Sequence, residues 1–265
     1  MVEMLLKFLS YPRGFLVSVF IGLHTLVMSA LVLVLYSLGM PRERIDKIIQ
    51  KGWARLVMWL AGVEVEVRGA NHVPTGKTGF LVLFNHTSHV DIITLYGYMP
   101  RSIRFGAKIE LFKIPFFGRA MLAMGALPID RRLREKVLQL YQAAIPRVAE
   151  GDAFALAPEG TRQPEHRLGK FKFGPFLFAI QAQMNIVPVV IAGAYDVLPK
   201  NSLWFNVGQW RRKIIMEILK PVATRGLSEA DIDSLQSAIH EDMHQTLERL
   251  KLELLGAQTT FVKNP

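Results

Sequence analysis

The sequence predicts an α/β fold with a mixed, largely parallel sheet flanked by helices, preceded by an N-terminal hydrophobic helix and an amphipathic helix. Short runs rich in β-branched and aromatic residues alternate with segments of helical spacing, which favours a largely parallel sheet. A long uncharged stretch lies near the N-terminus. These features divide the chain into membrane-anchoring helices over 1–61, an α/β domain over 62–256 and a loose tail over 257–265.

The stretch 15–38 contains no Asp, Glu, Lys or Arg. At ~1.5 Å per residue a helix of this length can cross a hydrocarbon core of ~30 Å, or lie within one leaflet. We expect His24, in the middle of the run, to be neutral and either to face protein or to snorkel locally. Lys7 and Arg13 precede the run and five basic residues follow it. This bias predicts a membrane-associated protein whose remaining chain lies on the cytoplasmic face.

A second helical pattern begins after Pro41, with Trp53 and Trp59 among its apolar positions. Basic residues occupy mostly the other faces. A basic helix that carries tryptophan is typical of a membrane interface, whereas the same apolar stripe also suits packing on the core of the domain. Both interpretations remain open. The apolar positions are Ile45, Ile48, Ile49, Leu56, Val57 and Leu60.

Along the rest of the chain, apolar and β-branched runs predict strands. Helices are expected over 91–98 and 132–149, and Pro146 should kink the second or end it early. A last helix begins with a capping box of Ser228 and Asp231 and ends at Gly256. The predicted strands are 79–84, 102–107, 125–130, 153–157, 186–193 and 213–218.

The composition limits the chemistry of the protein. The chain has 265 residues and 51% apolar residues, enough for a full core. Its 32 Lys and Arg against 22 Asp and Glu give a net charge of +10, which favours an anionic partner such as a membrane surface, a phosphorylated substrate or nucleic acid. The chain has no cysteine, so disulfides, a cysteine nucleophile and thiolate metal sites are excluded.

Residues 85–91 read NHTSHVD directly after a predicted strand, where open α/β sheets place ligands. Asp91 can accept the Nδ1 proton of His86 and leave Nε2 as a general base, an arrangement worth ~10²–10⁴ in rate. Two other interpretations remain open. His86, His89 and Asp91 are possible ligands of a first-row metal, and Ser88 with Asp91 can form a helix cap.

This motif, together with PEGTR at 158–162, resembles the glycerolipid acyltransferases, and within them the 1-acyl-sn-glycerol-3-phosphate acyltransferases. Two motifs in the right order form a much more specific signal than either alone. The resemblance covers roughly residues 40–220 and makes 62–256 an acyltransferase domain. Four further stretches match the family pattern: KIELFKIPFFG (108–118), GALPIDR (125–131), LGKFKFG (168–174) and IVPV (186–189).

The resemblance implies that a fatty acyl group passes from acyl-CoA or acyl-ACP to the sn-2 hydroxyl of lysophosphatidic acid, giving phosphatidic acid in phospholipid biosynthesis. It implies that His86 is the base and Asp91 its support, and it requires no metal or other cofactor. Cationic side chains suit the acceptor phosphate, and acyl carrier protein is a possible partner. The implied substrate-binding residues are Lys108, Arg131, Glu159, Gly160, Thr161 and Arg162.

Four rival interpretations remain. A related acyltransferase would use another lysophospholipid or a lyso-aminolipid as acceptor. A metal-dependent hydrolase would use His86, His89 and Asp91, and a non-catalytic membrane adaptor would bind anionic lipid through 42–55. Nucleic-acid binding is the weakest, because the basic residues gather beside the membrane anchor and not on an aromatic platform. The sequence leaves acyl chain length, the thioester carrier and the oligomeric state undetermined.

Overall fold

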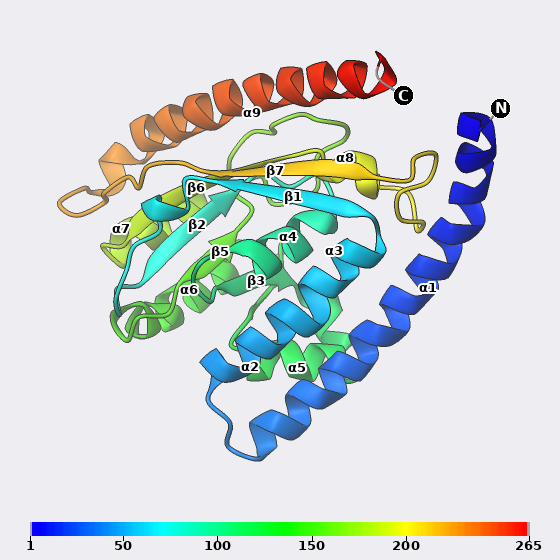
Figure 1. The fold of residues 1–265 in the computed structure, drawn as a ribbon. Coiled ribbons are helices and arrows are strands. Elements are labelled where there is room, and N and C mark those ends of the chain that lie inside the picture. Colours follow the sequence, from blue (N-terminus) through cyan, green and yellow to red (C-terminus); the bar gives the residue numbers. More distant parts are fainter. Residues whose placement is uncertain (1, 264–265) are drawn as a thin grey trace.

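A seven-stranded sheet forms the centre of the protein in a computed structural model that describes residues 2–263 (Figure 1). The strand order is β1-β7-β6-β2-β5-β3-β4, and only the β6–β7 pair is antiparallel. The predicted mixed, largely parallel sheet is therefore confirmed. The strands are β1 Val63–Arg68, β2 Phe80–Phe84, β3 Arg104–Lys108, β4 Leu127–Ile129, β5 Phe154–Leu156, β6 Asn185–Ala192 and β7 Arg212–Ile218.

Helices cover both faces of this sheet (Figure 1). On one face, α4 (Val90–Tyr98) packs together with the N-terminal helices in one apolar cluster. On the other, α6 (Arg134–Ala149), α7 (Phe173–Gln181) and α9 (Ile232–Lys263) share a second cluster. The shorter elements are η2 Ala70–His72, η3 Ile109–Lys113, α5 Phe117–Ala123, α8 Ala194–Val197 and η4 Glu229–Asp231.

The N-terminal helix α1 spans Val2–Ser37 and is longer than the uncharged run, because the helix continues through Pro12. Its stretch Lys7–Ser37 is long and apolar enough to cross a membrane by length and composition. In Figure 1 it runs along one side of the domain. Many large apolar side chains on its outer side are exposed, among them Phe8 and Leu16.

The second hydrophobic pattern forms α2 (Arg42–Ile49), a π-helical turn η1 (Gln50–Arg55) and α3 (Leu56–Leu60). Ile45, Val57 and Met58 are fully buried, so this segment packs on the core, one of the two interpretations left open by the sequence. Two hydrogen bonds join α1 to η1. His24 Nε2 lies 2.7 Å from the Gly52 carbonyl, and Trp53 Nε1 donates to Thr25 Oγ1 at 2.9 Å.

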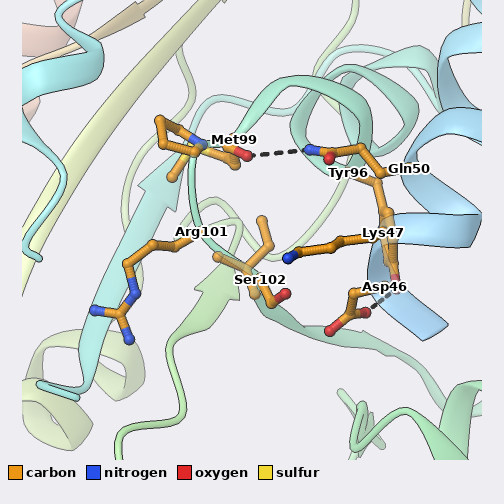
Figure 2. A pocket seen from close by; sticks show the side chains of 9 residues that line it. Asp46, Lys47, Gln50, Tyr96, Met99, Arg101 and Ser102 are labelled. Atoms are coloured by element: carbon orange, nitrogen blue, oxygen red, sulfur yellow. Dashed lines mark hydrogen bonds between the residues drawn. The ribbon is translucent and has the colours of Figure 1, made fainter. Parts of the chain in front are cut away.

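A buried ion pair fastens α2 to the sheet. Arg104 on β3 donates to Asp46 on α2 at 2.7 Å and to Asp152 at 3.2 Å, and the Tyr96 hydroxyl donates to Asp46 at 2.5 Å. Beside this network lies a pocket of about 90 Å³, where Figure 2 shows the Asp46–Tyr96 hydrogen bond. Since Asp46 and Arg104 are both nearly inaccessible to solvent, the pair fixes the position of α2.

Several local predictions were wrong. Strand β1 and helices α5 and α7 were not predicted. Pro146 does not end α6 early, since the helix continues past it to Ala149. The last helix has the predicted capping box, but it continues past Gly256 to Lys263 in place of the predicted loose tail. Gly256 lacks the positive φ of a left-handed helix terminus.

Candidate active site

The NHTSHVD segment lies at the carboxyl end of β2, the strand between β6 and β5 where the order of the sheet reverses. Asn85 fixes this end of the strand with two hydrogen bonds to Ile191 of β6, at 2.9 and 2.7 Å. The residues after β5 leave the sheet at the same edge, because β2 and β5 are parallel neighbours. The topology therefore brings NHTSHVD and PEGTR together.

His86 and Asp91 form the predicted pair. Asp91 Oδ2 lies 3.0 Å from His86 Nδ1 and accepts the backbone N–H groups of Thr87 and Ser88 at 2.7 and 2.8 Å. Three hydrogen bonds thus meet on one buried oxygen of Asp91. Among the described residues, His86 Nε2 has no hydrogen-bond partner, and the ring lines a large cavity with its edge packed on Phe84. The pair thus has the geometry of a general base.

Ser88 supports the start of α4. Its hydroxyl donates to the Leu198 carbonyl at 2.7 Å and accepts the Val90 N–H at 3.1 Å. Because the side chain is fully buried and does not line the cavity, its geometry fits a helix cap. Part of the predicted cap is present, since the Asp91 carboxylate accepts the Ser88 N–H. Helix α4 is capped at His89, however, and the Ser88 hydroxyl accepts the N–H of Val90 and not that of Asp91.

Glu159 lies behind His86. One carboxyl oxygen accepts the His86 backbone N–H at 2.9 Å, and the other accepts the Gly169 N–H at 3.0 Å. Burial raises the pKa of Glu159 to about 8, against the opposing effect of these two N–H groups, and the charge of Asp91 adds to the rise. A neutral Glu159 avoids a second negative charge beside Asp91. The sequence predicted this residue at the acceptor, but its carboxyl group does not line the cavity.

The cavity in front of His86 has a volume of about 1070 Å³. Much of its wall is apolar and comes from α1, η1, α4 and α5, including Ile21, Met28 and Met121. None of the described residues that line it is Asp or Glu. An acid-free cavity with this composition suits a ligand that combines an anionic group with long hydrocarbon chains.

All three predicted cations, Lys108, Arg131 and Arg162, line this cavity. Burial lowers the pKa of Arg131 and of Arg162, which marks two guanidinium groups held partly out of water. Lys108 is more exposed and lies 3.4 Å from Glu110. Sequence reasoning missed Arg134, Lys172 and Lys200, which also line the cavity.

Gly160 and Thr161 of the PEGTR turn also line the cavity. Gly160 has a φ of +73°, and an added Cβ would lie 2.8 Å from Lys172 Cε. The positive φ is the reason this turn favours glycine, because the flexible end of the Lys172 side chain could move away from an added Cβ. Lys200 Nζ donates to the Arg162 carbonyl at 2.8 Å, and the Gln163 N–H donates to the His86 carbonyl at 2.7 Å. These bonds hold the turn against the His–Asp pair.

His89 lines the cavity near His86, but no three His, Asp or Glu side chains gather as a metal site in the described part of the chain. Burial lowers the pKa of His89 to about 4, with a further contribution from Arg162. The imidazole is therefore neutral at physiological pH. The geometry does not assemble the rival metal site, whose three candidate ligands were His86, His89 and Asp91.

Residues 64–192 match the protein family described as Acyltransferase, and this match gives the class of protein. The human 1-acyl-sn-glycerol-3-phosphate acyltransferase alpha is 31% identical over 79% of this chain and 72% of its own length. The 1-acyl-sn-glycerol-3-phosphate acyltransferase of Borreliella burgdorferi is 26% identical over 79% and 82%. The chain belongs to the 1-acyl-sn-glycerol-3-phosphate acyltransferase family.

A solved structure agrees with this assignment. The crystal structure of the 1-acyl-sn-glycerophosphate (LPA) acyltransferase PlsC from Thermotoga maritima superimposes with a TM-score of 0.75 at 25% sequence identity. The similarity covers 91% of this chain and 97% of the other. It therefore extends beyond the α/β domain into the N-terminal helices, at least in part.

Proposed function

We propose that this protein transfers a fatty acyl group from an acyl thioester to the sn-2 hydroxyl of lysophosphatidic acid, producing phosphatidic acid in phospholipid biosynthesis. The observation that carries the proposal is the His86–Asp91 pair facing a cavity with several cations, a largely apolar wall and no acidic side chain. The names of the relatives support lysophosphatidic acid as acceptor.

The reaction follows from the orientation of His86. With Nδ1 held by Asp91, Nε2 accepts the hydroxyl proton while the oxygen attacks the thioester carbonyl carbon. Collapse of the tetrahedral intermediate breaks the carbon–sulfur bond, and the imidazolium returns its proton to the leaving thiolate. Asp91 remains ionised throughout and stabilises the imidazolium. No group of the protein is acylated, since the acyl group passes directly to the acceptor.

The cations give the site its preference for a phosphate monoester. Arg131 and Arg162 offer planar guanidinium groups that bind phosphate oxygens in pairs, and Lys108 adds a third positive charge. Thr161 and Gly160 complete the acceptor side. A related acceptor, such as another lysophospholipid or a lyso-aminolipid, would leave more of these charges without a counter-ion.

The membrane supplies the acceptor. The exposed apolar side of α1 provides the anchor, and the basic residues after it favour an anionic lipid surface on the cytoplasmic side. The donor is acyl-CoA or acyl-ACP, both of which are anionic and soluble. We expect no metal or other cofactor to be needed, because the imidazole performs both proton transfers.

The proposal is tested by mass spectrometry of the lipid product from purified protein in vesicles. Lysophosphatidic acid, lysophosphatidylcholine and an N-acyl lyso-aminolipid are compared as acceptors, each with acyl-CoA and with acyl-ACP. We expect phosphatidic acid to form fastest, by at least about tenfold, since a lost charged contact costs about 1.5–3 kcal/mol. Faster acylation of a lysolipid without a phosphate monoester would overturn the acceptor assignment.

A further inference from the structure

The connection 198–211, between α8 and β7, has an outer side that the catalytic site does not use. Leu203 is 76% exposed, and Trp204 and Trp210 are more than two-fifths exposed. The segment contains no Asp or Glu, and it includes Lys200 and the exposed Arg211. Exposed tryptophan beside basic residues is the composition of a membrane–water interface.

This connection lies beside the N-terminal half of α1 (Figure 1). The rings of Phe15 and Trp204 lie 5.0 Å apart, and the Arg13 guanidinium lies over the Trp210 ring at 4.6 Å. The backbone is also held, because the Phe205 N–H donates to Ser18 Oγ at 2.9 Å. The connection and the N-terminal half of α1 therefore form one surface.

The inner side of the same connection belongs to the active site. Leu198, Lys200 and Phe205 line the cavity in front of His86. Lys200 also bonds the carbonyl of Arg162, and the Leu198 carbonyl accepts the hydroxyl of Ser88. The exposed residues at 203–204 are thus only a few positions from Leu198, which bonds the NHTSHVD segment, and from Lys200, which bonds the PEGTR turn.

We infer that the 198–211 connection is a second membrane-contacting element, which inserts Leu203 and Trp204 into the interface of an anionic bilayer and holds the acceptor-binding turn at the lipid surface. Lipid is the occupant because the patch adjoins the lipid-facing side of α1 and because its only charges are positive. The inference deepens the proposed function and rests on it for the nature of the acceptor. It concerns the position of the loop, which can be measured without the reaction.

The chain has no cysteine, so a single cysteine can carry a fluorescent label. Leu203→Cys in the full chain, labelled with nitrobenzoxadiazole, is mixed with vesicles of phosphatidylglycerol and phosphatidylcholine. The matched control is Leu252→Cys, because Leu252 is 70% exposed and lies on α9, which covers the other face of the sheet. We expect nitroxide-labelled lipid to quench the label at position 203 and not at 252. Equal quenching at both positions, or none at 203, would overturn the inference.

A functional comparison uses Leu203→Asp and Leu252→Asp. With lysophosphatidic acid presented in vesicles, we expect Leu203→Asp to lower the acylation rate about tenfold. This is about the effect of no longer burying one leucine side chain in the bilayer. With a short-chain, monomeric acceptor the rate should match that of the unaltered protein. An equal loss with both acceptors contradicts a membrane role for the loop. If the unaltered protein acylates neither acceptor, the proposed function fails, while the quenching result still decides the position of the loop.

Discussion

Replacing Asp91 by asparagine tests the electrostatic part of the mechanism with little change in shape. The amide oxygen can still accept the backbone N–H groups of Thr87 and Ser88, which the carboxylate holds at 2.7 and 2.8 Å. The start of α4 is therefore preserved. What is lost is the negative charge beside His86.

The expected magnitude follows from Coulomb's law. An imidazolium and a carboxylate whose charges lie about 4 Å apart attract each other by about 4 kcal/mol at an effective dielectric constant of about 20. Since about 1.4 kcal/mol corresponds to a tenfold change in rate, Asp91→Asn should lower kcat by about 10²–10³. The KM for lysophosphatidic acid should change little, because Asp91 does not line the cavity.

The assay is acceptor-dependent thiol release from acyl-CoA, measured with the unaltered protein and with Asp91→Asn in the same vesicles. The thermal midpoint of each protein serves as a control for folding. If kcat of a folded variant falls by less than about fivefold, the reasoning is refuted. The negative charge of Asp91 would then stabilise the transition state by less than about 1 kcal/mol. A large rise in KM with unchanged kcat would instead assign Asp91 to acceptor binding.

Three further predictions concern stability and the acceptor turn. Asp46→Asn removes the charged partner of buried Arg104 and should lower the thermal midpoint by roughly 10 °C. The control is Asp130→Asn in a surface ion pair, which should lower the midpoint by less than about 2 °C. Similar values for the two variants would contradict the role of the buried pair. Gly160→Ala, at a φ of +73°, should lower kcat/KM about tenfold or more with the fold retained, and full activity would show that the turn tolerates a Cβ. Burial raises the pKa of Glu159 to about 8 from 4.5, so stability from its protonated form is present below pH 4.5 and is lost as the pH rises through 8. The thermal midpoint should therefore fall more steeply between pH 5 and 8 in the unaltered protein than in Glu159→Gln, and parallel curves would contradict this pKa.

The sequence predicted a strand before each of the two motifs, and the family resemblance placed both motifs in one site. It gave no strand order, and the structure shows that NHTSHVD and PEGTR meet because β2 and β5 are parallel neighbours. The contact of Lys200 with Arg162 could not be predicted, because it joins segments 38 positions apart across a loop without regular structure. Glu159 was recognised, but its bond to the backbone of His86 depends on how the turn folds back.

The errors in the fold have similar physical causes. Helix α7 is apolar on nearly all sides, since six of its nine residues are buried, and such a helix shows no periodic pattern. In β1 the glutamates alternate with valines because the strand lies at an edge of the sheet, and a polar edge strand gives a weak signal. The end of α9 was predicted from Gly256 alone, and this glycine does not have the positive φ of a left-handed helix terminus.

The central claim is that His86 is the base of an acyl transfer to a lysolipid hydroxyl. Its most direct test is thiol release from acyl-CoA by the purified protein and by His86→Ala, each with and without lysophosphatidic acid. We predict release that depends on the acceptor in the unaltered protein and falls by at least about 10² in the folded variant. Acceptor-dependent release that survives in His86→Ala would contradict the claim.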